Sequence, residues 1–297
     1  MFGAAGPESM AFVDPRHDPL PAWRRTVRYH FMRIVLWVAL RTWFRFRLEH
    51  FERLPTDACL VCINHPGWLD PMVVYAVWPA RPRVHIYGPK ETDMRIGGRN
   101  HLISWIGNAV PFDPDKTHLL TSAKRAVAVL QAGRVLVIAG EGRLTEDEDV
   151  VLPLNEGPAF FALRAQVPLV PVAINGTRWL RWGKTIRVRV GQPIATAGLR
   201  ADRATVRGLT DRLQADLGAL VLGYPDQAVP GRFGRWLTDV LADRPWRAAE
   251  ASAESAPDAT GAPDATGAAD AAKRPDSAGG TASGAAAEPS DAPLPVR

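Results

Sequence analysis

The residues in this sequence best suited to chemistry are His65 and Asp70, which stand five positions apart. An imidazole accepts a proton near neutral pH, and a neighbouring carboxylate can hold the other ring nitrogen in its protonated form. The pair therefore fits general-base catalysis. The same spacing also fits a surface turn in which the aspartate caps a helix and the histidine is solvated. The surrounding sequence has to distinguish these two interpretations.

A second segment with chemical potential contains Glu141, Gly142 and Arg143, with a further glycine at position 140. A glycine-flanked turn exposes backbone N–H groups, and a guanidinium can bind a phosphate through two hydrogen bonds. These residues are candidates for substrate binding. An ordinary strand-to-loop turn with solvated charges is the alternative.

Both segments follow apolar runs that predict buried strands, and these runs alternate with helical patterns. This alternation predicts an α/β layer architecture with one sheet, in which active sites lie beyond the strand ends. We expect strands at residues 58–63, 84–87, 134–139, 169–174 and 185–190, and helices at 71–77, 121–131, 158–165 and 202–222.

The composition is that of a globular protein with a basic surface. The chain has 297 residues, is 46% hydrophobic and carries a net charge of +5, with 36 basic residues of which nearly all are arginine. The two cysteines, Cys59 and Cys62, lie within an expected strand, so we expect them on opposite faces as core residues. Without a disulfide framework or a complete zinc ligand set, the sequence favours a reducing compartment and predicts no metal.

Residues 22–50 form a basic and aromatic segment that is distinct from the rest. Its apolar stretch is too short to cross a bilayer, so we expect an amphipathic helical segment on an anionic membrane surface. A helix packed on the domain core is the alternative. We expect residues 1–21 to be flexible, 223–246 to form a helical extension and 247–297 to be a disordered tail, because the tail is almost free of large apolar residues.

Taken in order, the motifs resemble the glycerolipid acyltransferase family of the 1-acylglycerol-3-phosphate acyltransferase type. His65 to Asp70 matches the family's H-x4-D motif, including the preceding Asn64, and Glu141-Gly142-Arg143 is similar to its E-G-x-R block. Residues 167–174 match its final proline-containing apolar block. Lys90 is similar to the family's lysine after the second strand. The likeness covers roughly residues 51–222.

The resemblance implies a single mixed-sheet acyltransferase domain at residues 51–222, flanked by helices. It implies transfer of a fatty acyl group from acyl-CoA or acyl carrier protein to the hydroxyl of 1-acylglycerol-3-phosphate, giving phosphatidic acid. His65 would be the general base and Asp70 would orient it. Lys90, Glu141, Gly142 and Arg143 would bind the acceptor, with backbone N–H groups near Gly142 as candidates for stabilising the oxyanion. No cofactor is implied.

One departure leaves the acceptor open. The family's second motif usually ends in arginine, where this sequence has Asp113. A different lyso-lipid or hydroxylated lipid is therefore an alternative acceptor, and a non-catalytic membrane-surface binding protein is a third possibility. A nucleic-acid partner is disfavoured, because the arginines stand beside tryptophan and aliphatic residues. We expect a peripheral enzyme on the cytoplasmic face of the cell membrane.

Overall fold

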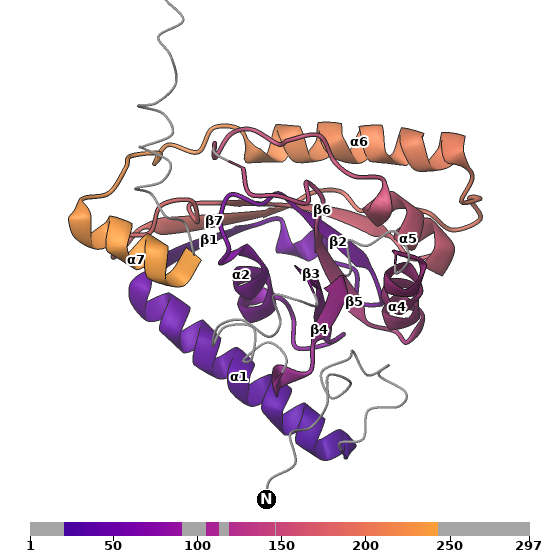
Figure 1. Cartoon of the computed structure of the whole chain (residues 1–297), viewed down its shortest axis with the longest axis horizontal. Helices are drawn as coiled ribbons and strands as arrows, with labels where there is room; N and C mark the ends of the chain where they lie inside the picture. Colours follow the sequence, from indigo (N-terminus) through magenta and orange to yellow (C-terminus); the bar gives the residue numbers. More distant parts are fainter. Residues whose placement is uncertain (1–20, 91–104, 113–118, 146, 243–297) are drawn as a thin grey trace, which may run out of the picture. The chain divides into compact units, whose positions relative to one another are not determined.

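The computed structural model describes residues 21–90, 105–112, 119–145 and 147–242, except for the side chains of residues 89, 90, 119, 241 and 242 (Figure 1). The chain divides into two compact units, residues 1–251 and 252–297, and every described residue belongs to the first. Residues 1–20, Asp113 and the tail at 247–297, for which we stated expectations from the sequence, lie outside the described part.

A mixed sheet of seven described strands forms the centre of this unit, in the order β1-β7-β6-β2-β5-β3-β4. All neighbouring strands are parallel except β6 and β7, which are antiparallel. The strands are β1 (Arg45–Glu49), β2 (Leu60–Ile63), β3 (Val84–Lys90), β4 (Ala109–Phe112), β5 (Val135–Ala139), β6 (Leu169–Asn175) and β7 (Thr185–Val190). The α/β fold expected from the sequence is confirmed.

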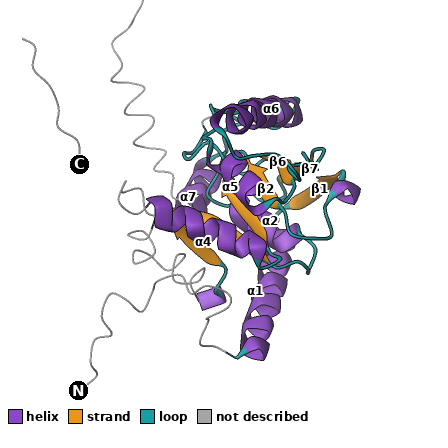
Figure 2. Cartoon of the chain, turned by 90° about the vertical axis from the view of Figure 1, so that its right-hand side faces the viewer, coloured by secondary structure: helices purple, strands orange, loops and turns teal. Residues whose placement is uncertain are grey.

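Helices cover both faces of the sheet (Figure 2). One face packs against α1 (Ala22–Trp43) and α2 (Asp70–Val77), and the other packs against α4 (Leu119–Gln131), α5 (Gly157–Ala165) and α6 (Arg203–Val221). Successive β2 residues enter opposite cores: Val61 and Ile63 belong to the first, Leu60 and Cys62 to the second. Central strands buried on both faces explain why their sequences are continuously apolar.

The two cysteines are buried, free thiols that belong to opposite cores. Burial raises the pKa of Cys59 to about 12, and it also raises the pKa of Cys62. Both thiols are therefore protonated and unreactive at neutral pH. Their prediction as core residues on opposite faces is confirmed.

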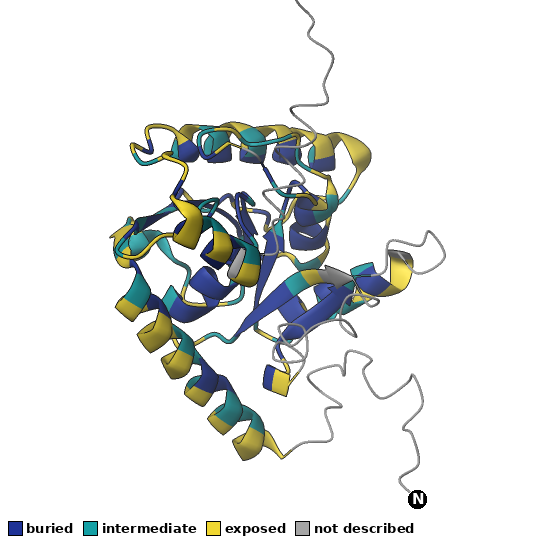
Figure 3. Cartoon of the chain, turned by 60° about the vertical axis from the view of Figure 1, so that its left-hand side comes forward, coloured by how far each residue is buried: buried dark blue, intermediate teal, exposed yellow. Residues whose placement is uncertain are grey.

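The segment 22–50 differs from its prediction in two ways. The helix ends at Trp43, and residues 45–49 form β1, which pairs with β7. The helix is also not amphipathic in the usual sense, because apolar residues occupy both of its faces. The inner face buries Tyr29, Met32 and Leu40, while residues such as Phe31 on the outer face remain exposed. Figure 3 shows buried and exposed positions alternating along this helix. The sheet therefore begins at residue 45, before the domain start expected at residue 51 and before the first expected strand at 58–63.

The helical extension predicted at residues 223–246 contains α7 (Arg232–Ala242). It packs against the loop before β7, where the N–H of Leu180 donates to the Thr238 hydroxyl at 2.9 Å. Among the helices that the structure describes, none is long and apolar enough to span a membrane.

Candidate active site

His65 and Asp70 form a hydrogen-bonded pair in the turn between β2 and α2. Nδ1 of His65 lies 2.9 Å from Oδ2 of Asp70. The Asp70 side chain is completely buried, whereas 17% of the His65 side chain is exposed. A buried carboxylate accepts from Nδ1–H, which leaves Nε2 of His65 with a free lone pair. The pair therefore has the geometry of a general base with its orienting group.

The turn is fixed on both sides by its neighbours in the sheet. Asn64 directly follows β2, and its buried side chain donates to the Ile174 carbonyl at 2.9 Å and accepts from the Ile174 N–H at 2.7 Å. It thereby extends the pairing of β2 with β6 by one residue. The N–H of Gly67 donates to Oδ2 of Asp70 at 2.9 Å, which ties the turn to the first residue of α2.

Gly67 is required by the close approach of a second chain segment. A β-carbon at this position would lie 2.3 Å from the carbonyl oxygen of Thr177, which is a backbone atom. A side chain at Gly67 would therefore push the turn away from the segment that follows β6.

The structure brings Glu141 to the histidine, as the order of motifs suggested. The N–H of His65 donates to Oε1 of Glu141 at 3.1 Å, and the N–H of Thr145 donates to the His65 carbonyl at 2.9 Å. Burial raises the pKa of Glu141, and the hydrogen bond from the His65 N–H opposes this shift. Glu141 therefore holds the backbone of the turn that carries His65 and Asp70, and it does not face solvent.

The remaining sequence-predicted residues have different surroundings. Arg143 is exposed on the same turn as Glu141. Gly142 adopts a left-handed conformation with φ 70°, and its N–H donates to the Ala139 carbonyl at 3.2 Å. That N–H is therefore occupied within the turn, and the expectation that backbone N–H groups near Gly142 stabilise an oxyanion stays a prediction. Lys90 ends β3, and its side chain lies outside the described part.

Sequence reasoning missed Thr177 and Glu148. The Thr177 hydroxyl donates to Oδ1 of Asp70, across 107 positions of sequence. Glu148 is buried and accepts from the backbone on both sides of Thr177. Thr177 lies two residues beyond the end of β6, which is next to β2 in the sheet, so the argument from strand ends would have identified it had it been applied to this strand. No local pattern marks Glu148.

Within the described residues, no group of three or more His, Cys, Asp or Glu side chains is arranged to hold a metal ion. The expectation that the reaction needs no cofactor stays a prediction.

Comparison with known proteins gives a consistent result. Residues 45–175 match the family model described as Acyltransferase. The chain is 28% identical over 176 residues to the 1-acyl-sn-glycerol-3-phosphate acyltransferase alpha of Ovis aries, a match covering 56% of this chain and 58% of the relative. It is 28% identical over 177 residues to the 1-acyl-sn-glycerol-3-phosphate acyltransferase beta of Homo sapiens, a match covering 56% of this chain and 61% of the relative. The match thus spans less than two thirds of these relatives.

A solved structure shares the fold. The crystal structure of the 1-acyl-sn-glycerophosphate (LPA) acyltransferase PlsC from Thermotoga maritima aligns with a TM-score of 0.54 at 18% identity. The alignment covers 70% of this chain and 86% of that chain. The family resemblance carried by the H-x4-D motif is confirmed.

Proposed function

We propose that this chain, whose residues 45–175 carry an acyltransferase-family domain, transfers a fatty acyl group from a thioester to the free hydroxyl of 1-acylglycerol-3-phosphate. The product is phosphatidic acid, and the donor is acyl-CoA or acyl carrier protein. The observation that carries the proposal is the His65–Asp70 hydrogen bond, which leaves Nε2 of a partly exposed imidazole free to accept a proton.

The reaction needs no covalent enzyme intermediate. Nε2 of His65 takes the proton of the acceptor hydroxyl while the hydroxyl oxygen bonds to the thioester carbonyl carbon. The carbon–sulfur bond then breaks, and the imidazolium returns the proton to the departing thiolate. The buried Asp70 carboxylate holds Nδ1–H and stabilises the positive charge that develops on the ring.

The direct test is an assay of the purified chain with acyl-CoA and a series of acceptors. We expect acyl transfer to 1-acylglycerol-3-phosphate at a higher kcat/KM than to lyso-lipids without a phosphomonoester. A preference for another lyso-lipid would support the alternative acceptor. Vesicle binding without acyl transfer from either donor to any acceptor would favour the non-catalytic alternative.

Arg143 is proposed to bind the phosphate of the acceptor, with Lys90 as a second cation. This assignment rests on the exposure of the Arg143 guanidinium beside the Glu141 turn and on its suitability for phosphate. In Arg143→Ala we expect the KM for 1-acylglycerol-3-phosphate to rise about tenfold while the KM for the donor stays unchanged. Arg143→Lys should restore part of the loss. An unchanged acceptor KM would remove Arg143 from this role.

We further propose that the outer face of α1 binds a lipid surface. Large apolar side chains on this face are at least 40% exposed and recur at helical spacing: Trp23, Val27, Phe31, Ile34, Val35, Trp37 and Val38. Arginines accompany them, with Arg24 lying over Trp23 and Arg41 over Trp37. Exposed apolar residues with aromatic and basic neighbours are typical of a helix at a bilayer interface.

The apolar surface continues beyond α1. Trp182, which is 63% exposed, packs its ring 4.8 Å from Trp43 at the end of α1. A cavity of about 590 Å³ beside these rings is lined in part by Arg41, Arg45 and Arg181. Because Arg181 pairs with Asp226 at 2.5 Å, the other two arginines supply the charge that favours anionic headgroups. The membrane partner and a peripheral location on the cytoplasmic face are thus part of the proposal.

Flotation with vesicles tests this surface. Replacing Phe31 and Ile34 together by aspartate should lower partitioning into vesicles that contain anionic lipid at least tenfold, because two charges would have to enter the interface. Leu222→Asp is the matched control, since Leu222 is also exposed but lies at the end of α6. Unchanged partitioning of the double variant would contradict the assignment.

A further inference from the structure

The carboxylate of Asp70 is held by three donors from two separate parts of the chain. Oδ2 accepts from Nδ1 of His65 and from the N–H of Gly67, both at 2.9 Å. Oδ1 accepts from the hydroxyl of Thr177. The first two donors belong to the turn that carries the dyad, whereas the third comes from the segment after β6. Among the contacts of the described residues, the Thr177 hydroxyl is the one that holds the oxygen facing away from the histidine.

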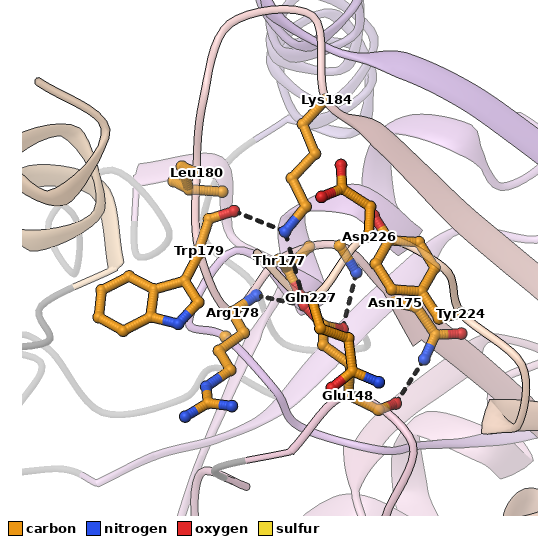
Figure 4. A network of polar contacts seen from close by, with 12 residues as sticks. Glu148, Asn175, Thr177, Arg178, Trp179, Leu180, Lys184, Tyr224, Asp226 and Gln227 are labelled. Atoms are coloured by element: carbon orange, nitrogen blue, oxygen red, sulfur yellow. Dashed lines mark hydrogen bonds and ion pairs between the residues drawn. The ribbon is translucent and has the colours of Figure 1, made fainter. Parts of the chain in front are cut away.

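Thr177 is itself completely buried and firmly held. The carboxylate of Glu148 accepts from the backbone on both sides of it, from Gly176 N–H at 2.7 Å and from Arg178 N–H at 3.1 Å (Figure 4). A carboxylate that binds the residues before and after the threonine restricts the backbone at this position. The direction of the Thr177 hydroxyl is thus set by a group that does not touch the dyad.

Glu148 is in turn compensated by a buried lysine. Nζ of Lys184 lies 3.9 Å from Oε1 of Glu148, and each side chain is only 1% exposed. Nζ also donates to the Trp179 carbonyl at 2.9 Å, within the loop that follows Thr177 (Figure 4). Burial raises the pKa of Glu148 and lowers that of Lys184, and each charge opposes the shift of the other. The ion pair joins the segment between β5 and α5, which carries Glu148, to Lys184 directly before β7.

We propose that Thr177 is a positioning residue for the reaction: its hydroxyl fixes the rotation of the Asp70 carboxylate so that Oδ2 faces Nδ1 of His65. A carboxylate held at one oxygen only can turn about its Cβ–Cγ bond, and the imidazole would turn with it. The Glu148–Lys184 pair supports this role by holding the backbone of Thr177. The expected effect on kcat rests on the proposed function. The orientation of the Asp70 carboxylate by Thr177 does not.

Thr177→Val tests the hydroxyl, because valine keeps the shape and removes the donor. We expect kcat to fall at least tenfold with the KM of both substrates unchanged, and the Tm to fall moderately, because an oxygen of a buried carboxylate loses its donor. Thr177→Ser keeps the donor and should retain kcat within threefold. Thr177→Ala serves as a second variant without a donor, in case valine lowers the yield of folded protein.

A proton resonance provides a second measurement that needs no turnover. The hydrogen of His65 Nδ1, bonded to a buried carboxylate, should give a downfield proton NMR signal that is absent in His65→Ala. We expect this signal in the wild type and in Thr177→Ser, and its loss or broadening in Thr177→Val. If the wild type transfers no acyl group, the proposed function fails while this signal still decides the role of Thr177.

Two results would overturn the inference. One is a Thr177→Val enzyme with kcat within threefold of the wild type, or, for a chain without turnover, an unchanged His65 signal in that variant. The other is a Thr177→Ser enzyme impaired as much as Thr177→Val, because the methyl group and not the hydroxyl would then matter.

Discussion

His65 and Asp70 depend on neighbours that contribute geometry and not chemistry. Gly67 supplies an N–H to Asp70 and the space that lets Thr177 approach. Glu141 holds the His65 backbone from another strand exit. If His65 is the proton acceptor that we propose, it needs this support, because small displacements of reacting atoms greatly lower a reaction rate.

Replacing Gly67 by alanine should therefore damage catalysis more than stability. The new β-carbon would lie 2.3 Å from the Thr177 carbonyl oxygen, so the turn or the loop has to move. We expect kcat to fall at least tenfold and the free energy of unfolding to fall by about 1–3 kcal/mol, as for other overpacked sites. Steady-state kinetics and urea unfolding measure the two effects.

Gly208→Ala is the matched control, because a β-carbon there meets nothing within 4 Å on the surface of α6. This variant should keep full activity because position 208 is far from the proposed site in sequence and lies on the surface of α6. Its free energy of unfolding should rise by up to about 1 kcal/mol, because alanine has a higher helix propensity than glycine. A Gly67→Ala enzyme with normal kcat would show that the close approach of Thr177 is unimportant.

The residues of the candidate site that the sequence indicated are those in short motifs or at the ends of predicted strands. His65, Asp70 and Glu141 belong to motifs whose residues lie close together in the chain or follow predicted strands, and the structure brings them together. Thr177 and Glu148 act through contacts between distant segments, and no spacing in the sequence encodes such contacts.

Among the elements, the buried strands were easier to predict than the edge strands. β2, β5 and β6 are apolar along their length because helices cover both of their faces. β1 alternates arginine with apolar residues and was taken as a continuation of the helix, and β4 is a four-residue edge strand that contains a proline. β1 is largely exposed and therefore lacks a continuous apolar run, whereas β4 is buried but short and interrupted by proline, which disfavours a strand prediction.

The buried ion pair between Glu148 and Lys184 connects two separate segments of the fold, and its loss should lower the free energy of unfolding strongly. Lys184→Met would leave the buried Glu148 carboxylate without its cation, and breaking such a pair typically costs about 3–5 kcal/mol. We expect a loss of this size in the free energy of unfolding, measured by urea denaturation at pH 7. The loop that carries Thr177 should also become more susceptible to proteolysis.

The control for this variant is Arg212→Met. Arg212 forms an exposed ion pair with Asp216 one turn along α6, at 3.8 Å. Exposed ion pairs of this kind contribute about 0.5 kcal/mol or less to the free energy of unfolding. Equal effects of the two substitutions would contradict the importance assigned to the buried pair.

For the molecule as a whole, a buried histidine makes stability depend on pH. His85 lies on β3 opposite Leu136 of β5, where burial and the nearby Arg134 lower its pKa from 6.5 to about 4. Between these two values the unfolded chain binds a proton that the folded protein does not. The free energy of unfolding therefore decreases as the pH falls from about 6.5 to about 4, by up to about 3 kcal/mol from this residue.

His85→Leu should remove this part of the pH dependence. Comparing urea unfolding at pH 7 and at pH 4.5, we expect the variant to lose about 2 kcal/mol less than the wild type over this interval. His50→Asn, which changes an exposed histidine in a left-handed position that asparagine tolerates, should keep the wild-type dependence. A His85→Leu profile parallel to the wild type would show that His85 does not titrate in this range.

The structure differs from the prediction at the N-terminal boundary of the sheet. The sheet extends back to residue 45, and α1 packs against the sheet domain through one face while exposing an apolar outer face. Composition alone could not decide whether this helix packs against the domain or exposes an apolar face, because it does both: apolar residues lie on its buried face and on its exposed face.

The central claim is that His65 removes a proton from the acceptor hydroxyl, and acyl transfer by His65→Ala tests it most directly. With acyl-CoA and 1-acylglycerol-3-phosphate, we expect kcat at least 100-fold below the wild type, in the range that general-base catalysis contributes. Vesicle binding and Tm should be unchanged, and His50→Asn should turn over normally. A folded His65→Ala protein with near wild-type turnover would contradict the account.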